Sequence, residues 1–226
     1  MGETVRLVSA RDGFHFDAYR APVRDARRGG LVICHAIWGV TPHLRTLADH
    51  YAEIGYETLV PNLFERQHPG FAERDWDDAV GARQMGFGDA THWGADVLDL
   101  VQAAIDALAP PMFALGFCFG GTTAWLAAAR CSGLSAVACY YGGQIINYLG
   151  ETPKVPTILH MGKTDELIPA ADVEAIREAH PELPVFMYEA GHAFVAPSGY
   201  HEDSARLSQL RTLAHFSRNS GVRGES

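Results

Sequence analysis

From residue 31 onward, short apolar runs alternate with segments that have the spacing of amphipathic helices. Strands are predicted at 31–37, 56–60, 112–117, 134–140, 157–161 and 185–188. Helices are predicted at 42–54, 119–131, 170–180 and 203–216, with further helical patterning that ends near 108. Strands that alternate with helices form a mainly parallel sheet with helices on both faces. The pattern therefore predicts a doubly wound α/β fold.

Two shorter alternating runs open the chain, at 4–9 and 14–21, around Arg11-Asp12-Gly13. Period-two alternation on either side of a glycine-containing turn predicts a β-hairpin. The chain has 226 residues, and α/β folds often exceed 200 residues without dividing into two domains. We expect a single domain over 1–218, followed by a disordered tail over 219–226.

The composition argues against several classes of protein. The chain has 18 Lys and Arg against 27 Asp and Glu, so its formal net charge is −9. Nucleic-acid-binding proteins carry a basic field instead. No apolar run approaches the ~20 residues that span a bilayer, and the N-terminus lacks the pattern of a secretory signal. The four cysteines have no CxxC spacing. We therefore expect a reduced cytoplasmic protein that binds neither nucleic acid nor membrane.

The most specific local motif is Gly116-Phe117-Cys118-Phe119-Gly120-Gly121, between an apolar strand and an alanine-rich helix. This is the context of a nucleophile elbow, a sharp turn that exposes a reactive side chain. The glycines permit the turn, and a helix N-terminus favours a thiolate. The elbow normally carries serine, but the chain contains no GxSxG. A lone cysteine is more often a packing residue, yet this setting favours Cys118 as a nucleophile.

Two further residues lie just after predicted strands. Asp165 follows the strand at 157–161, and His192 follows the strand at 185–188. Loops at the carboxyl ends of parallel strands meet at one edge of the sheet. The order nucleophile, acid, histidine is that of α/β-hydrolases. Asp165 could instead cap the next helix, and His192 could be a surface histidine, but the order of all three predicts a triad with Cys118.

With these motifs the chain resembles the dienelactone hydrolase family, the cysteine branch of the α/β-hydrolases, from about residue 31 to 216. The resemblance is carried by the elbow motif and by four further segments: HAIWG at 35–39, YYG at 140–142, HMGKTDELIP at 160–169 and EAGHAF at 189–194. It implies an α/β-hydrolase fold. It also implies hydrolysis of a small-molecule lactone or activated ester through an acyl-cysteine intermediate.

Two positions depart from the family pattern. Ala36 stands where the family usually has a glutamate that helps control the proton on the cysteine. Ala196 stands where the family has an arginine that holds a substrate carboxylate, and only Arg83 lies in the region of the second arginine. Glu65 could replace the missing glutamate, although a solvated loop charge is the favoured interpretation. We therefore expect a neutral or aromatic ester rather than dienelactone itself.

The residue types predict a mechanism that needs no metal and no cofactor. His192 takes the proton of Cys118, and Asp165 fixes the imidazole tautomer. We expect the side chains of Cys118 and His192 to pair directly, which leaves Cys118 partly thiolate at neutral pH. The backbone N–H groups of Ile37 and Phe119 are expected to hold the oxyanion.

Further residues are assigned by their position beside these groups. Trp38 and Tyr141 flank the predicted site and are expected to contact the substrate. His35 is also a candidate substrate-binding residue, and we expect it to hydrogen-bond the oxyanion loop. Cys34 and His35 point to opposite faces of a strand, which argues against a metal site. Other aromatic residues are interpreted as core rather than as pocket: Phe64, Trp76, Phe87 and Trp93.

Two alternatives come from other functional classes. A non-catalytic ligand-binding relative is suggested only by Ala36. A redox sensor would require a second thiol near Cys118, and Cys34 is the one candidate. The sequence leaves the natural substrate open, and it does not distinguish a monomer from a homodimer.

Overall fold

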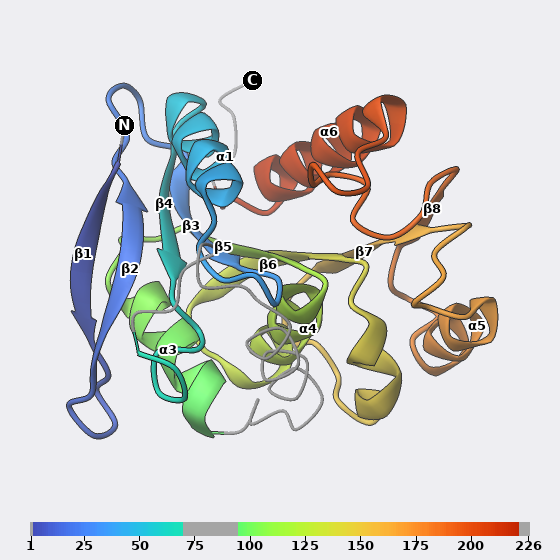
Figure 1. Ribbon diagram of the computed structural model, residues 1–226, viewed down its shortest axis with the longest axis horizontal. Coiled ribbons are helices and arrows are strands. Elements are labelled where there is room, and N and C mark those ends of the chain that lie inside the picture. The colour runs from blue at the N-terminus through green and yellow to red at the C-terminus, as the bar shows by residue number, and fades with distance from the viewer. Residues whose placement is uncertain (1, 70–94, 222–226) are drawn as a thin grey trace.

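A twisted eight-stranded sheet forms the centre of the computed structural model, which describes residues 2–69 and 95–221. The strand order is β1-β2-β4-β3-β5-β6-β7-β8, with the N-terminal hairpin at one edge and β8 at the other (Figure 1). The strands are β1 Glu3–Val8, β2 His15–Ala21, β3 Gly29–Cys34, β4 Tyr56–Pro61, β5 Met112–Phe117, β6 Leu134–Tyr140, β7 Thr157–Gly162 and β8 Val185–Tyr188.

The pairing confirms the predicted doubly wound sheet and its hairpin. β1 and β2 pair antiparallel, and β2 also pairs antiparallel with β4. From β4 through β3 to β8, every neighbouring pair is parallel. The carboxyl ends of β3, β5, β6, β7 and β8 therefore lie along one edge of the sheet, where the loops that follow them can meet.

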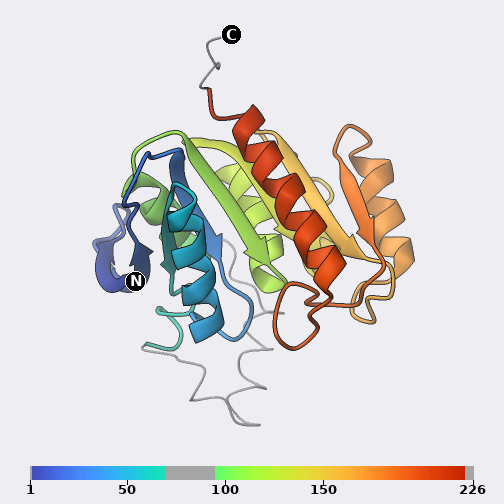
Figure 2. The ribbon, with the colours of Figure 1, turned by 90° about the horizontal axis from the view of Figure 1, so that it is seen from above.

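Helices cover both faces of the sheet. Figure 2 shows α1 and α6 on one face and α3, α4 and α5 on the other. Their bounds are α1 Pro42–Glu53, α3 Ala95–Asp106, α4 Phe119–Arg130, α5 Ala170–Ala179 and α6 Glu202–Arg218. Within the described ranges, no helix combines the length and the apolar character required to cross a membrane.

The central helix α4 is buried on all sides. Every residue from Phe119 to Ala129 is buried, and β3 and β5 are buried along their whole length. A helix enclosed in this way is apolar all round, which explains the alanine-rich sequence that follows the elbow. The elbow is therefore held between two fully packed elements.

Two features differ from the sequence prediction, and a third cannot be compared over most of its length. The strand predicted to reach residue 37 ends at Cys34, because the chain turns there into a hydrogen-bonded loop. A 3₁₀ helix over Gly143–Tyr148 was not predicted. Most of the helical patterning before 108 lies outside the described residues, which resume at residue 95 where α3 begins.

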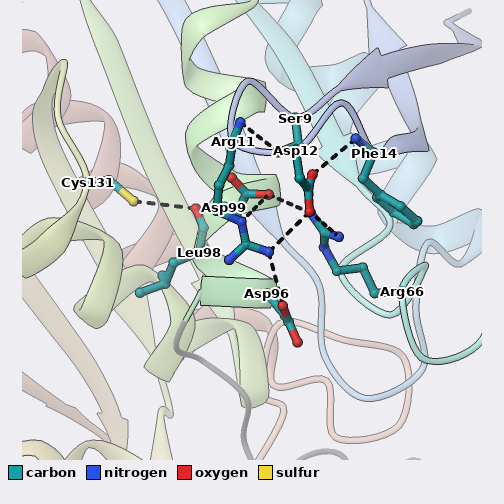
Figure 3. Close-up of polar contacts among 9 residues, drawn as sticks. All are labelled: Ser9, Arg11, Asp12, Phe14, Arg66, Asp96, Leu98, Asp99 and Cys131. Carbon is teal, nitrogen blue, oxygen red and sulfur yellow. Dashed lines mark hydrogen bonds and ion pairs between the residues drawn. The ribbon is translucent and has the colours of Figure 1, made fainter.

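An ion-pair cluster ties the hairpin turn to the rest of the fold (Figure 3). Arg66 donates hydrogen bonds to Asp12 at 3.0 and 3.1 Å and to Asp99 of α3 at 2.7 Å. Its guanidinium lies 4.2 Å from the ring centroid of Phe14. The bond from Arg66 holds the pKa of Asp12 well below its usual range. The cluster thus anchors the segment after β4 to both the hairpin turn and α3.

Candidate active site

Cys118 lies at the sharp turn between β5 and α4, with φ 55° and ψ −115°. This conformation is rare for a non-glycine residue and costs about 1–3 kcal/mol. A Cβ at Gly116 would lie 1.9 Å from the carbonyl oxygen of Gly120, and a Cβ at Gly120 would lie 2.0 Å from that of Cys34. Both positions therefore require glycine, and the structure has the geometry of a nucleophile elbow.

Asp165 and His192 meet in the loops that follow β7 and β8. His192 Nδ1 and Asp165 Oδ2 are 2.8 Å apart, and the carboxylate of Asp165 is fully buried. The other carboxylate oxygen accepts the N–H of Leu167 at 2.9 Å. The N-cap of α5 is Pro169, so Asp165 does not serve as the helix cap that the sequence left open. The carboxylate fixes a proton on Nδ1 and leaves Nε2 for other chemistry.

The pKa of His192 reflects these neighbours. Burial alone would lower it, but the hydrogen bond to Asp165 and the neighbouring Cys118 sulfur outweigh burial and raise the pKa to about 9. Nε2 is buried and has no hydrogen-bond partner among the described residues. Cys118 is thus close enough to raise the pKa of His192. Their predicted direct pairing stays a prediction.

The loop after β3 passes beside the elbow. The carbonyl oxygen of Ala36 accepts Gly39 N–H at 3.1 Å and lies 2.6 Å from His35 Nδ1. His35 Nε2 accepts the N–H of Leu63 at 2.9 Å, so the ring proton is on Nδ1 and is donated to Ala36. Burial lowers the pKa of His35 to about 4, and the ring is therefore neutral. These bonds set the orientation of the peptide that precedes Ile37.

His35 requires a correction. It is fully buried beneath the loop, both ring nitrogens are bonded to backbone groups, and it is not among the residues that line the cavity. The prediction that it contacts substrate is wrong, because the strand ends at Cys34 and directs the ring inward. Its predicted hydrogen bond to the loop after β3 is confirmed.

A cavity of about 540 Å³ opens beside Cys118. Trp38 is 39% exposed in its wall, whereas Tyr141 is only 1% exposed. No Lys, Arg, Asp or Glu is found among its described lining residues. They are Ala36, Ile37, Trp38, Gly39, Thr41, His43, Leu44, Phe117, Cys118, Tyr141, Leu167, His192, Ala193, Val195, Ala196, Pro197 and Ser198.

The structure therefore brings together most of the predicted site. Cys118, His192, Ile37, Trp38 and Tyr141 line one cavity. Asp165 lies behind His192, and Phe119 begins the helix whose first N–H groups face the elbow. Sequence reasoning missed several lining residues, among them His43 in the first turn of α1 and Leu167 two positions after Asp165. Their nearness in sequence to the oxyanion loop and to Asp165 was the available signal.

The structure also tests the interpretations of Glu65 and Phe64. Glu65 is 5% exposed and accepts a hydrogen bond from Asn62, so its interpretation as a solvated loop charge is wrong. Phe64 is core, as predicted, with its ring centroid 5.1 Å from that of Phe119. The other candidates lie outside the described residues: Trp76, Arg83, Phe87 and Trp93.

The thiols bear on the redox alternative. All four cysteines are free. Cys34 is completely buried, and burial raises the pKa of its thiol, so it is poorly suited to act as a resolving thiol. Within 2–69 and 95–221, no group of three or more His, Cys, Asp or Glu residues could hold a metal ion.

Comparison with known proteins agrees with this geometry. The model of the dienelactone hydrolase family matches residues 16–220. A carboxymethylenebutenolidase from Pseudomonas putida is 32% identical over 219 residues, which cover 91% of this chain and 92% of the relative. Among solved structures, a Klebsiella pneumoniae protein assigned as a dienelactone hydrolase is 25% identical, with a TM-score of 0.83 over 96% of this chain and 99% of its own.

A second solved structure is more distant in sequence. It is a dienelactone hydrolase-like promiscuous phosphotriesterase from metagenomic libraries, 21% identical, with a TM-score of 0.76 over 97% of this chain and 99% of its own. This likeness supports the fold alone. The family match and the identity to the Pseudomonas putida relative carry the assignment: this chain is a hydrolase that belongs to the dienelactone hydrolase family.

Proposed function

We propose that this protein is a cysteine-dependent carboxylic ester hydrolase that cleaves neutral, largely apolar esters or lactones through an acyl-cysteine intermediate. One observation carries the proposal. Cys118 and His192 line the same cavity, and Asp165 bonds the far side of the His192 ring at 2.8 Å. A nucleophile, a base and a group that orients the base are the parts that acyl transfer requires.

Acylation begins with transfer of the Cys118 thiol proton to His192 Nε2. The Asp165 carboxylate favours the resulting imidazolium, in keeping with the raised pKa of His192. The thiolate then attacks the ester carbonyl carbon, a C–S bond forms, and the carbonyl electron pair moves to oxygen. The N–H groups of Ile37 and Phe119 hold this oxyanion, each donor being worth roughly 3–4 kcal/mol.

Collapse of the tetrahedral intermediate re-forms the carbonyl and breaks the bond to the leaving oxygen. The imidazolium of His192 gives its proton to that oxygen. Water then enters and loses a proton to the same nitrogen, and the hydroxide attacks the acyl-cysteine. The Cys118 sulfur leaves as thiolate, and the carboxylic acid is released.

The chemistry of the cavity supports a neutral substrate. Its described lining residues include no Lys or Arg that could pair with a substrate carboxylate. Ala36 and Ala196, which stand where the family pattern has charged residues, both line the cavity, and neither side chain carries a charge. A volume of about 540 Å³ lies within the range of small-molecule sites. An acyl group without charge therefore fits best.

Hydrolysis of p-nitrophenyl butyrate tests the proposal. The wild-type protein is expected to turn over this ester, and Cys118→Ala is expected to lose turnover to the level of the uncatalysed reaction. Cys131→Ala is the matched control, since it removes a half-buried thiol elsewhere in the chain and should leave the rate unchanged. Turnover that survives in Cys118→Ala would contradict the proposal. A substrate pair that differs only in a terminal carboxylate tests the preference for neutral esters.

We also propose a cytoplasmic location, which the free thiols support. Cell fractionation with an untagged protein is the direct measurement, and recovery in a periplasmic or secreted fraction would contradict it.

A further inference from the structure

Cys118 and Tyr141 are neighbours across two adjacent strand ends. Phe117 of β5 pairs with Tyr140 of β6, so Cys118 and Tyr141 are the next residues on parallel strands, whose backbones lie about 5 Å apart. The N–H of Cys118 donates to the carbonyl oxygen of Tyr140 at 3.0 Å. Both residues have a left-handed backbone, with φ 55° and 37° respectively. Strain at two adjoining positions of one edge is typical of a functional site.

The side chain of Tyr141 is enclosed within this site. It lines the cavity with Cys118, and its ring centroid is 4.9 Å from that of His192. Its hydroxyl is buried and has no hydrogen-bond partner in the described part of the chain. The hydroxyl of the adjacent Tyr140 is also buried but is 2.7 Å from Thr212 Oγ1. Buried hydroxyls are nearly always bonded, so the orphan at Tyr141 calls for a partner that arises during the reaction.

Cys118, which neighbours Tyr141 across the strand ends and lines the same cavity, is the candidate for that partner. Burial raises the pKa of the Tyr141 hydroxyl well above its ordinary value, and the neighbouring Cys118 sulfur raises it further. The phenol therefore keeps its proton and can act as a donor. The titratable groups that line the cavity, among the described residues, are Cys118, Tyr141, His192 and His43, with Asp165 behind His192.

We propose that the Tyr141 hydroxyl is a catalytic hydrogen-bond donor to the sulfur of Cys118 in its thiolate form. The inference rests on the proposed function, because it assigns the stabilisation of the thiolate to this hydroxyl together with the imidazolium of His192. No bond to Tyr141 forms or breaks. The thiol proton moves to His192 Nε2, and the phenol proton stays on its own oxygen.

Alkylation of Cys118 by iodoacetamide at a series of pH values tests this role without any substrate. The modified Cys118 peptide is quantified by mass spectrometry, so the other thiols do not interfere. The proposed hydrogen bond stabilises the thiolate of Cys118, and Tyr141→Phe removes that bond. The variant should therefore raise the midpoint of the alkylation profile by about one pH unit. The kcat/KM for p-nitrophenyl butyrate should fall about tenfold.

Tyr140→Phe is the matched control. It makes the same change at the next residue, in an equally buried ring whose hydroxyl bonds Thr212. It should lower the thermal midpoint but leave the alkylation profile in place. An unchanged profile in Tyr141→Phe, or an equal shift in both variants, would overturn the inference.

Replacement of Tyr141 by 3-fluorotyrosine covers the case in which the phenylalanine variant fails to fold. Fluorine makes the phenol a stronger donor at almost constant volume, so the midpoint should move to lower pH. A midpoint that does not move overturns the inference. The proposed function fails separately: ester turnover by Cys118→Ala would contradict it, whereas a normal Cys118→Ala result with an unshifted Tyr141→Phe profile removes only the role of Tyr141.

Discussion

Two histidines, one half-buried and one fully buried, flank the elbow and have opposite properties. His192 follows β8 and bonds the carboxylate of Asp165, and its pKa is raised to about 9. His35 follows β3 and bonds only the backbone groups of Ala36 and Leu63, and its pKa is lowered to about 4. Burial lowers the pKa in both cases, so the charge of the partner determines the outcome. One imidazole is prepared to accept a proton, whereas the other stays neutral and holds a loop in place.

The largest effect is expected from removing the carboxylate beside His192. Asp165→Asn should lower kcat/KM for p-nitrophenyl butyrate by about 10³–10⁴-fold, because the imidazole loses both its fixed tautomer and the charge that favours imidazolium. The titration midpoint of His192, followed by NMR, should fall from about 9. Glu166→Gln removes the adjacent, exposed carboxylate and is the control. A comparable loss of kcat/KM in both variants would contradict the prediction, because it would show that the raised pKa of His192 does not depend specifically on Asp165.

A smaller loss is expected at His35. His35→Ala leaves the N–H of Leu63 without its acceptor and removes one of the two donors to the carbonyl oxygen of Ala36. This loss should reduce the free energy of unfolding by about 1–3 kcal/mol. The loosened oxyanion loop should lower kcat roughly 10–100-fold with little change in KM. His35→Gln supplies both a donor and an acceptor and should restore most of the activity. Failure of that rescue would mean that the imidazole of His35 does more than orient the loop.

How much of this contrast the sequence could predict depends on the range of the interactions. β5 and β6 were predicted with the observed bounds, and chain order predicted Asp165 and His192 after their strands. These features follow from local periodicity and from the geometry of parallel sheets. The burial of Glu65 and the inward turn of His35 depend on packing between distant segments, which no local pattern encodes. The unpaired hydroxyl of Tyr141 is likewise a property of the packed site.

Acid should destabilise the fold because His35 is neutral when folded and takes up a proton when unfolded. The pKa of His35 is about 4 in the folded protein and ~6.5 when unfolded. The unfolded state therefore binds the proton first, and stability is lost as the pH falls through this interval. His35 contributes a slope of up to about 1.4 kcal/mol per pH unit. Urea unfolding from pH 7 to 4 should show a shallower slope for His35→Gln, and parallel curves would contradict the prediction. His160, whose pKa burial lowers to about 3, remains in both proteins.

The smallest effect is expected at a distance from the cavity. Arg66 fixes the segment that carries Leu63, the backbone partner of His35, to Asp12 and Asp99. Arg66→Met leaves both carboxylates without this guanidinium and should lower the thermal midpoint by a few degrees, with a two- to fivefold fall in kcat. Arg6→Met breaks an exposed pair with Asp17 and should change neither quantity. Equal thermal midpoints and equal kcat values in the two variants would show that the ion-pair cluster does not affect the site.

Mass spectrometry of the reacting enzyme tests the central claim most directly. The protein is mixed with p-nitrophenyl butyrate, quenched in acid within the first turnovers and digested. We predict a butyryl group on the peptide that carries Cys118, present in the wild-type protein and absent from Cys118→Ala. Steady hydrolysis with no acyl group on this cysteine, or with the group on another residue, would contradict the account.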